Sequence, residues 1–480
     1  MDGMKHALPE LHPDAAQQAL DALGARAVEC AMGDFTSIAR GKQLAVDDFC
    51  GMGGCKLPSV ILGLTLTSGE PQIVFGPMLP KSYVDMALVP DMQTLALYPG
   101  RPGLAQVICE PRGSWDSSHH GRTVDASEFS PRAALRSVLA AYQQAGLQVL
   151  AAPELELFLL HRHEGTDAAS SHTVSRLDSA RARPDAMARE SACESFSLER
   201  AGHFQAYFDD LYAACEALRI PISGHAHESA FSQYEINLRP GEPLAQADAV
   251  WRFKRVAREL AARHGFLASF APKPFLQEPG TGMHWHFSVQ RTGEAWPHVF
   301  ALPTGPSTLA LRHFIAGIQA EAAAAMALLA PYDMSFDRIR LSNASPSHAT
   351  WGEDDRSLAL RIPQASPQAR RVELRLPGGD ANPYLCVAAA LGLGLAGLRA
   401  AREPLGGHDG STEFAADALA LPRSLPDALD QLERSCALRS LLGAPLVDAY
   451  LAIKRHEHAE RAALPDPRQQ WDMAHLIELA

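Results

Sequence analysis

The sequence has no basic excess and no long apolar run. Its 480 residues include 43 Lys and Arg against 55 Asp and Glu, so the net charge is −12 with His neutral. A dedicated nucleic-acid binder carries a strong basic excess, so this acidic balance argues against that class. The longest strongly apolar stretch, 387–398, is shorter than the roughly 20 residues that cross a bilayer. We expect neither a nucleic-acid partner nor a membrane association.

The cysteines form no C-x-x-C pair. All eight stand singly, at positions 30, 50, 55, 109, 193, 215, 386 and 436. In a chain of this length, such cysteines are typical of reduced, mostly buried thiols in a cytosolic protein. The N-terminal stretch MDGMKHALPELHPD lacks the basic start and the apolar run of a signal peptide. We therefore expect a cytoplasmic protein.

Several catalytic signatures are also missing. The sequence has no G-x-x-x-x-G-K-[ST], no H-E-x-x-H and no G-x-S-x-G, which excludes P-loop, zincin and α/β-hydrolase sites. Residues 392–397, GLGLAG, fit the dinucleotide-binding pattern G-x-G-x-x-G. They lie inside an Ala- and Leu-rich helical stretch rather than between a strand and a helix, so the match does not indicate a nucleotide-binding fold.

The pattern of the chain changes near residue 120. After a helix over 14–24, short strand-like runs separated by Gly and Pro continue to about 120, among them SVILGLTLT, PQIVFGPM, TLALYPG and AQVICEP. Ser130-Pro131 then predicts a helix start. The patterns beyond it predict helices over 132–145, 203–218, 245–264, 308–330 and 384–401, and strands over 149–160, 220–238, 265–271, 283–290, 357–362 and 370–376. We place a domain boundary at 120 and read the polar stretch 162–202 as a long excursion.

Two carboxylates stand close together in an otherwise apolar strand. In APELELFLL, Glu154 and Glu156 are two residues apart, so both side chains leave the same face. Adjacent buried carboxylates repel each other and lose solvation, and a protein tolerates them when cations or a metal pair with them. A solvent-exposed face would explain this segment alone equally well.

Three further segments combine acids, histidines and arginines. GHAHESAFSQYEINL holds Glu228 and Glu235, KPFLQEPGTGMHWHFSV holds His284, His286 and Ser288, and ARRVELRLPGGDANPYL holds Arg371, Glu373 and Arg375. Five carboxylates and one imidazole suit two hard divalent cations, Mg²⁺ or Mn²⁺ rather than Zn²⁺. Arg338, Arg356 and Arg361 add bidentate groups of the kind that hold phosphate or carboxylate. A charge-rich surface produces one such segment by chance more readily than all four.

In these segments the chain resembles the glutamine synthetase superfamily. The matches run in order from roughly 28 to 400 and include PELELF, HESAFSQYE, KPFLQEPGTGMHWHFS and RSLALRIPQASPQARRVELRLPGGDANPYL. The resemblance implies an α+β fold, with a small β-grasp-like N-terminal domain (1–120) and a larger catalytic domain (121–480) whose curved antiparallel sheet is flanked by helices. It also implies a homo-oligomer, a dodecamer of two hexameric rings, in which the N-terminal domain of one subunit completes its neighbour's site.

The resemblance implies a role for each matching residue. Glu156, Glu228 and Glu235 would bind the cation on the glutamate side, and Glu154, His284 and Glu373 the cation on the nucleotide phosphates. Arg338 and Arg375 would hold glutamate carboxylates beside Gly280. His286, Ser288, Arg356, Arg361 and Arg371 would line ATP, and Arg338, Arg356 and Arg375 are the expected catalytic arginines. The implied cofactors are ATP and two or more Mg²⁺ or Mn²⁺ ions, and the reaction passes through γ-glutamyl phosphate.

The chain departs from the family at the ammonium end of the site. True glutamine synthetases carry an Asp-Gly-Ser-Ser type loop in the N-terminal domain, but GMGGCKLPSVILGL (51–64) has no acid. They also carry a flap Glu after the glutamate-binding Arg, but no acid stands between Arg338 and Glu353. The usual Asn-Gly of the glutamate loop reads Pro279-Gly280. WGEDDRSLALRIP and LPGGDANPYL resemble the γ-glutamylpolyamine synthetase branch, so we predict an ATP-dependent ligase that joins glutamate to a polyamine or other alkylamine.

Two alternatives remain at this point. The first is a true glutamine synthetase that uses ammonia, against which the missing acids count. The second is a non-catalytic structural or regulatory oligomer of the same fold, although all six metal positions carry competent ligands. A free alkylamine has a pKa near that of Lys, about 10, so a base must take its proton. Glu353 and Asp354 are weak candidates for that base. The family's adenylylation-tyrosine segment has no clear match in GGHDGSTEFAADALALPRSL, so we expect that control to be absent.

Overall fold

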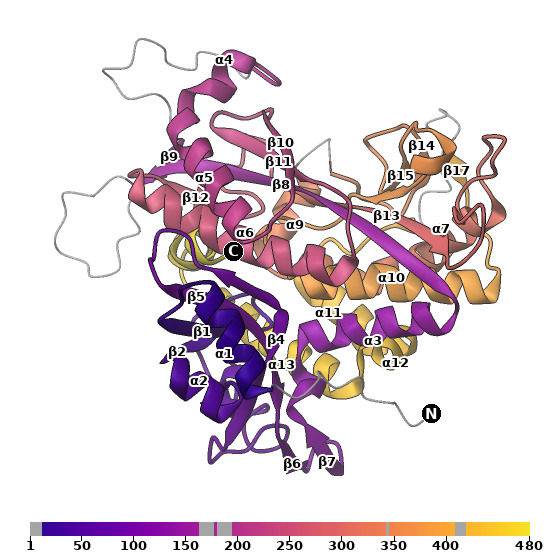
Figure 1. Cartoon of the computed structure of the whole chain (residues 1–480). Coiled ribbons are helices and arrows are strands. Elements are labelled where there is room, and N and C mark those ends of the chain that lie inside the picture. Colours follow the sequence, from indigo (N-terminus) through magenta and orange to yellow (C-terminus); the bar gives the residue numbers. More distant parts are fainter. Residues whose placement is uncertain (1–11, 163–176, 180–193, 342–344, 409–418) are drawn as a thin grey trace.

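A computed structural model describes residues 12–162, 177–179, 194–341, 345–408 and 419–480 (Figure 1). Most of the stretch 162–202, part of the segment read for adenylylation, and Cys193 lie outside these residues. The other seven cysteines are free thiols, and all but Cys436 are buried, as predicted.

The N-terminal region forms a five-stranded sheet in the order β2-β1-β5-β4-β3. Its strands are β1 (Ala27–Gly33), β2 (Ala39–Ala45), β3 (Cys55–Pro58), β4 (Asp85–Leu97) and β5 (Leu104–Arg112). β1 pairs with β5 in parallel and the other pairs are antiparallel. Helices α1 (Pro13–Ala22) and α2 (Val46–Met52) accompany this sheet. The mixed pairing agrees with the expected β-grasp-like module.

Two predicted strands in this region were wrong. The run 59–67 forms the 3₁₀ helix η1 (Ser59–Leu62) followed by turns, and 71–78 forms turns with a single isolated bridge from Phe75 to Leu79. Leu62, Leu66 and Val74 are buried nevertheless. These apolar side chains pack into the core from irregular backbone that Pro58, Gly63 and Pro71 interrupt, so burial did not require strand pairing.

A hairpin leads to the first long helix. β6 (Ser114–Ser117) pairs with β7 (Arg122–Asp125), and η2 (Ala126–Phe129) connects them to α3 (Pro131–Gln144). The Ser130 side chain accepts a hydrogen bond from the Ala133 N–H, and Pro131 occupies the first helical turn. The predicted helix start is therefore confirmed, with the chemistry expected of an N-cap.

The larger sheet has ten strands within the described residues, with the path β10-β11-β8-β13-β16-β15-β14-β17. Its members are β8 (Leu147–Arg162), β9 (Leu177–Ser179), β10 (Ile222–His227), β11 (Gln233–Leu238), β12 (Leu267–Ser269), β13 (Met283–Arg291), β14 (Trp351–Glu353), β15 (Leu360–Ile362), β16 (Val372–Leu374) and β17 (Gly407–His408). The path from β10 to β15 is antiparallel, as expected, and β14 pairs in parallel with β15 and β17. The predicted strand 220–238 is a hairpin, because residues 228–232 form its turn.

Helices flank this sheet. In chain order they are α4 (Leu198–Ala201), η3 (Gly202–Phe204), α5 (Gln205–Ala217), α6 (Pro243–Arg263), α7 (Leu309–Ala320), α8 (Ala322–Leu329), α9 (Asp333–Arg340), η4 (Pro367–Ala369), α10 (Pro383–Ala400), α11 (Leu425–Arg434), α12 (Cys436–Leu442), α13 (Ala444–Ala462), the π-helical η6 (Arg468–Leu476) and α14 (Ile477–Leu479). Figure 1 shows α3 and α10 side by side beneath the sheet. Both α3 and α6 contact β8, so these two helices pack against the large sheet.

Helix α10 is long and apolar enough to span a bilayer by composition, yet 78% of that window is buried inside the protein. The sharply bent pair α12–α13 passes the same test only if the two helices count as one span. Asn382 caps α10 through the backbone N–H groups of Tyr384 and Leu385. The interior position of α10 is that of a core helix.

The predicted helix 308–330 is two helices, α7 and α8, because Glu321 leaves helical geometry (φ −118°, ψ 12°). The Ser435 hydroxyl donates to the Glu321 carboxylate at 2.7 Å, so a contact from a distant segment accompanies the break. The helices between Leu425 and Leu479 had no sequence prediction, and they pack against the rest of the core through α8, α10 and η2.

Candidate active site

The central strand β8 carries two of the predicted ligands. Glu154 lies opposite His284 of β13, and Glu156 lies opposite Glu235 of β11. Directly opposed residues of neighbouring strands present their side chains to the same face. The strand register therefore gathers side chains that stand up to 130 positions apart in the sequence.

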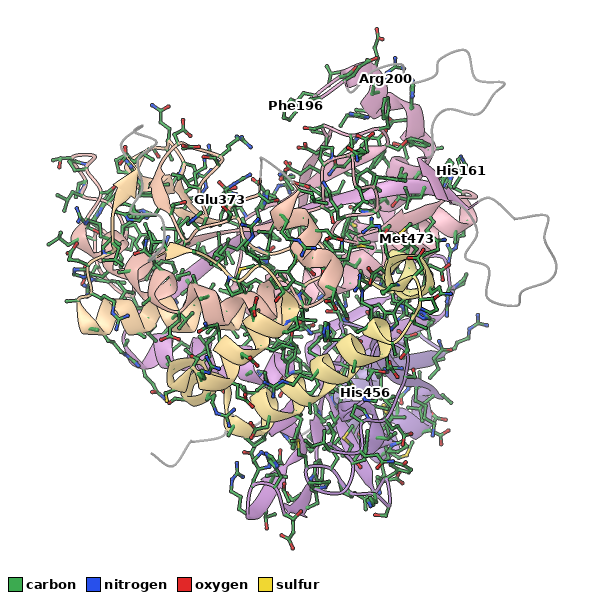
Figure 2. All side chains as sticks on the ribbon, turned by 180° about the vertical axis from the view of Figure 1, so that it is seen from behind. His161, Phe196, Arg200, Glu373, His456 and Met473 are labelled. Carbon is green, nitrogen blue, oxygen red and sulfur yellow. The ribbon has the colours of Figure 1, made fainter. Side chains whose placement is uncertain are left out.

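On the side of β13 away from β8, the neighbouring strand is β16. His286 lies opposite Glu373, a carboxylate with no solvent exposure, and Figure 2 labels Glu373 at this sheet. Arg361 and Arg375 donate to the two oxygens of Glu373 at 2.8 and 2.6 Å. The His286 Nε2–H donates to Glu154 Oε1 at 2.9 Å. A fully buried carboxylate is thus balanced by two guanidinium groups.

The carboxylate of Glu156 lies at the start of β13. It accepts the Gly282 N–H at 2.8 Å and the Gln233 side-chain amide at 3.2 Å. Burial, followed by repulsion from Glu228, raises the pKa of Glu156 to about 7. Glu228 itself lies in the turn between β10 and β11. Burial and the neighbouring negative charge therefore favour the protonated form of this carboxyl until a cation binds.

Glu235 is in a similar position. The Asn237 amide donates to Glu235 Oε1 at 3.0 Å. Burial, followed by repulsion from Glu154, raises the pKa of Glu235 to about 8. Carboxylates crowded in this way favour a divalent cation, whose charge removes the repulsion and displaces the protons.

Two groups of three ligand atoms lie close enough to hold one ion each. Glu154, Glu235 and His284 form one group, and Glu154, His286 and Glu373 form the other once the His286 Nε2 proton is displaced, with all ligand atoms of a group within 4.8 Å of one another. Burial and the nearby arginines Arg375 and Arg338 hold the pKa of His284 well below its usual range, so its imidazole is neutral and able to ligate. The donor set fits divalent cations. The division of ligands between them stays a prediction.

The Gly-Pro loop before β13 is closely packed. A Cβ atom on Gly280 would lie 2.4 Å from the Pro272 carbonyl oxygen and 2.8 Å from Arg338 Cγ. Gln233 donates to the Gly280 carbonyl at 2.9 Å, and Arg338 of α9, itself buried, donates to the Leu376 carbonyl at 3.0 Å. The loop therefore needs glycine for close approach to Arg338, next to the site where a glutamate carboxylate is predicted.

The predicted phosphate-binding residues line the other side of the patch. Arg371 Nε donates to His286 Nδ1 at 3.1 Å, so the His286 proton is on Nε2. Ser288 follows two residues on along β13 and shares the face of His286. Arg356 lies in the exposed turn after β14, and its charge favours the ionised form of Glu154. Hydrogen bonds thus place His286, Arg371 and Arg361 around Glu154 and Glu373.

Sequence reasoning missed three polar side chains or groups that support the acids: the Gln233 amide, the Asn237 amide and the Gly282 N–H. Gln233, Glu235 and Asn237 alternate along β11, so period-two spacing from Glu235 is the signal that would have found the two amides.

Residues 128–473 match the family model "Glutamine synthetase, catalytic domain", which covers most of the chain. The chain belongs to the glutamine synthetase family. It is 31% identical to the glutamine synthetase of Methanocaldococcus jannaschii over 80% of this chain and 81% of that protein. It is also 31% identical to γ-glutamylputrescine synthetase PuuA of Escherichia coli K12, over 69% and 68% of the two chains. The glutamate–isopropylamine ligase of a Pseudomonas species is 28% identical over 93% and 94%.

The fold agrees with this family membership. A solved structure described as "GmaS/ADP complex-Conformation 1" superposes with a TM-score of 0.75 at 24% identity, over 96% of this chain and 99% of that one. The expected α+β fold and the family resemblance are therefore confirmed. Glutamine synthetase family ligases use ATP and divalent metals, and this protein is a carbon–nitrogen ligase.

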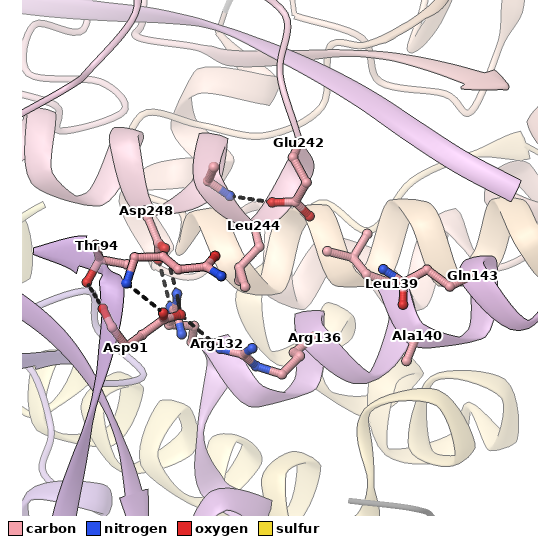
Figure 3. Close-up of a pocket in the computed structure, with 12 residues that line it drawn as sticks. Asp91, Thr94, Arg132, Arg136, Leu139, Ala140, Gln143, Glu242, Leu244 and Asp248 are labelled. Atoms are coloured by element: carbon pink, nitrogen blue, oxygen red, sulfur yellow. Dashed lines mark hydrogen bonds and ion pairs between the residues drawn. The ribbon is translucent and has the colours of Figure 1, made fainter. Parts of the chain in front are cut away.

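A cavity of about 550 Å³ lies between β4, α3 and α6 (Figure 3). Arg132 of α3 donates to Asp91 of β4 and to Asp248 of α6 at 2.8 Å, and Arg136 donates to Asp91 at 3.3 Å. None of the predicted site residues lines this cavity. Its arginine and aspartate side chains pair with one another and join the N-terminal sheet to the two helices, which is a structural role.

Proposed function

We propose that this ligase joins the γ-carboxylate of glutamate to a polyamine or other alkylamine, with ATP converted to ADP and phosphate through γ-glutamyl phosphate. One observation carries the proposal. Glu154, Glu156, Glu235, His284, His286 and Glu373 lie on one sheet in directly opposed pairs, while the segments 51–64 and 339–352, which supply ammonium-site acids in the family, contain no acid. The half-reaction that activates glutamate is kept, and the nucleophile differs.

The cations have identifiable protein ligands in this proposal. Glu156, Glu228 and Glu235 would hold one, and Glu154, His284 and Glu373 the other. When bound, they supply electrostatic stabilisation of the charge on the transferred phosphoryl group. Arg361 and Arg375 orient the Glu373 carboxylate through hydrogen bonds from both sides. Because these hydrogen bonds already fix the Glu373 side chain, binding a cation costs little further side-chain entropy.

The arginines bind the anionic substrates. Arg338, beside Gly280, and Arg375 would hold the carboxylates of glutamate, while Arg356, Arg361 and Arg371, with His286 and Ser288, would hold ATP. Guanidinium groups suit both tasks because they form paired hydrogen bonds to planar carboxylates and to phosphates. On this assignment, Arg338, Arg356 and Arg375 contact the reacting groups.

The remaining role to assign is that of the base that takes the proton of the amine. Asp354 accepts a hydrogen bond from Arg361 at 2.7 Å, which lowers the pKa of this exposed carboxyl and makes it a poor base. Glu353, on β14, is exposed, and no Arg or Lys of the described residues pairs with its carboxylate. Of the two candidates, we favour Glu353.

The test is phosphate release from ATP and glutamate with a panel of nucleophiles: ammonium, putrescine, spermidine, ethanolamine, methylamine and isopropylamine. We expect kcat/KM for at least one amine to exceed that for ammonium. Mass spectrometry of the product distinguishes a γ-glutamyl amide from glutamine. Equal or better turnover with ammonium would establish a true glutamine synthetase, the candidate that 31% identity to the M. jannaschii enzyme supports. Absence of Mg²⁺-dependent ATP binding in calorimetry would instead favour the non-catalytic oligomer.

Three expectations from the sequence accompany this proposal. The domain division at residue 120 stays a prediction, and that residue lies in the turn of the β6–β7 hairpin. Assembly into a dodecamer of two hexameric rings and a cytoplasmic location also stay predictions.

A further inference from the structure

Two histidines and an aspartate meet on the far side of the molecule from the large sheet. His119 and His120 lie in the turn of the β6–β7 hairpin, and Asp448 lies on α13 (Figure 1). Nε2 of His119 is 3.3 Å from Asp448 Oδ2, and Nε2 of His120 is 3.2 Å from the same oxygen. The three ligand atoms lie within 4.8 Å of one another. The cluster joins segments more than 300 positions apart in the sequence.

The hydrogen bonds around His120 determine where its proton is. The Ser117 hydroxyl lies 2.9 Å from the Pro77 carbonyl oxygen, which has no proton to give, so Ser117 donates that bond. Ser117 Oγ also lies 2.9 Å from His120 Nδ1, and because its own proton is already used, the His120 Nδ1–H must donate. The neutral ring therefore has an unprotonated Nε2, whose lone pair points at a carboxylate oxygen.

Two lone pairs 3.2 Å apart repel each other unless a cation stands between them. One solution is a second proton on His120. The other solution is a metal ion, which accepts both lone pairs and that of His119.

The distances fit a metal of the zinc class. Ligands at about 2.0 to 2.2 Å from a tetrahedral Zn²⁺ lie about 3.3 to 3.5 Å from one another, close to the two measured separations. The surroundings also fit: Ser117 fixes the tautomer of His120, and Arg439 of α12 donates to the other oxygen, Asp448 Oδ1, at 2.7 Å. His119 is 37% exposed along its side chain, so an ion and a coordinated water have access.

We infer that His119, His120 and Asp448 form a binding site for a divalent transition metal, Zn²⁺ or a close relative, that fastens the β6–β7 hairpin to helix α13. The site is separate from the hard-cation site of the ligase, because it shares no residue with it and two imidazoles prefer Zn²⁺ to Mg²⁺. Its role is structural, since it joins an N-terminal segment to a C-terminal helix.

The test compares the untagged full-length protein with His119→Ala, after removal of metal and in excess Mg²⁺. In a calorimetric titration, the wild type should bind one more equivalent of Zn²⁺ per chain than the variant. Any Zn²⁺ that binds at the catalytic sheet is the same in both proteins and cancels in this comparison. Loss of an outer-shell partner alone costs about 10- to 100-fold in metal affinity, so loss of this ligand should weaken the site by at least about 100-fold. Asp448→Asn should do the same.

A matched control is His456→Ala, on the same helix (Figure 2). Its imidazole pairs with Glu460 at 3.2 Å without a second histidine, so this variant should bind zinc like the wild type. Co²⁺ gives a second measurement. The visible absorption of bound Co²⁺ should fall by the contribution of one site in His119→Ala and should stay unchanged in His456→Ala. His119 is exposed, so folding should survive, and circular dichroism and gel filtration check this. Equal zinc stoichiometry in the wild type and His119→Ala would overturn the inference and leave an imidazolium paired with Asp448.

Discussion

At the scale of single residues, the site depends on carboxylates whose environments differ sharply. Glu373 is fully buried and held by two arginines, whereas Glu156 and Glu235 are crowded by other acids and have pKa values raised to about 7 and 8. The first already has two guanidinium partners, and the other two gain most from a cation. These differences give two predictions.

Glu373→Gln should lower kcat/KM by at least about 100-fold, because it removes a predicted metal ligand and the charge that balances Arg361 and Arg375. Breaking this buried pair should also cost about 3 to 5 kcal/mol of stability. Steady-state kinetics and thermal unfolding measure the two effects. Glu294→Gln, an exposed acid beyond β13, is the control and should change neither. Full activity of Glu373→Gln would refute the metal assignment.

The metal-free protein should lose stability as the pH rises. A carboxyl whose pKa is raised on folding stabilises the fold below its unfolded pKa, about 4.5, and that contribution is lost as the pH passes the folded value. For Glu156 and Glu235 the window therefore runs from about pH 4.5 to 8. In Glu235→Gln, the fall of the thermal midpoint over this window should be smaller, and saturating Mg²⁺ should reduce it in the wild type. Identical pH profiles for wild type and variant in EDTA would contradict the prediction.

At the scale of elements, strand register and one tight loop build the site. β8, β11, β13 and β16 bring their ligands together by direct opposition, and the loop before β13 lies against Arg338 of α9. The close contact between the Gly280 backbone and Arg338 therefore positions helix α9, and residue 280 has no room for a side chain.

Gly280→Ala should move Arg338, because the new Cβ would lie 2.4 Å from the Pro272 carbonyl oxygen and 2.8 Å from Arg338 Cγ. Overpacking of this kind costs about 1 to 3 kcal/mol, and we expect KM for glutamate to rise about tenfold or more. Gly202→Ala is the matched control, since its Cβ meets nothing within 4 Å. An unchanged KM in Gly280→Ala would separate the loop from the glutamate site.

At the scale of the whole molecule, buried polar contacts fasten the N-terminal sheet to the catalytic part. Asn382 donates to the Asp34 carbonyl at 3.0 Å, Trp251 to the Ser37 carbonyl at 3.0 Å, and the Leu66 N–H to Glu457 at 2.6 Å. These bonds fix the orientation of the N-terminal sheet within each chain. A ring in which the N-terminal domain of one chain completes its neighbour's site would require such a fixed orientation.

The oligomer is the prediction at this scale. Light scattering coupled to gel filtration should give the mass of twelve chains of 51.7 kDa each. Because each site would need the neighbouring N-terminal domain, specific activity should fall as dilution dissociates the rings. A monomer with full activity would contradict the expected arrangement.

The sequence by itself determined the family and the types of most of the main elements, and it predicted the residues of the metal and phosphate end, because strand periodicity, helix caps and long motifs are local. Glu154 and Glu156 share a face in any strand, and Ser130 caps a helix wherever that helix lies. Only the tertiary structure decided which strands are neighbours, the break at Glu321, the irregular backbone over 59–67, the supporting Gln233 and the meeting of His119 and His120 with Asp448. Each of these depends on contacts between segments far apart in the chain, and the free energy of such contacts belongs to the packed molecule rather than to any local pattern.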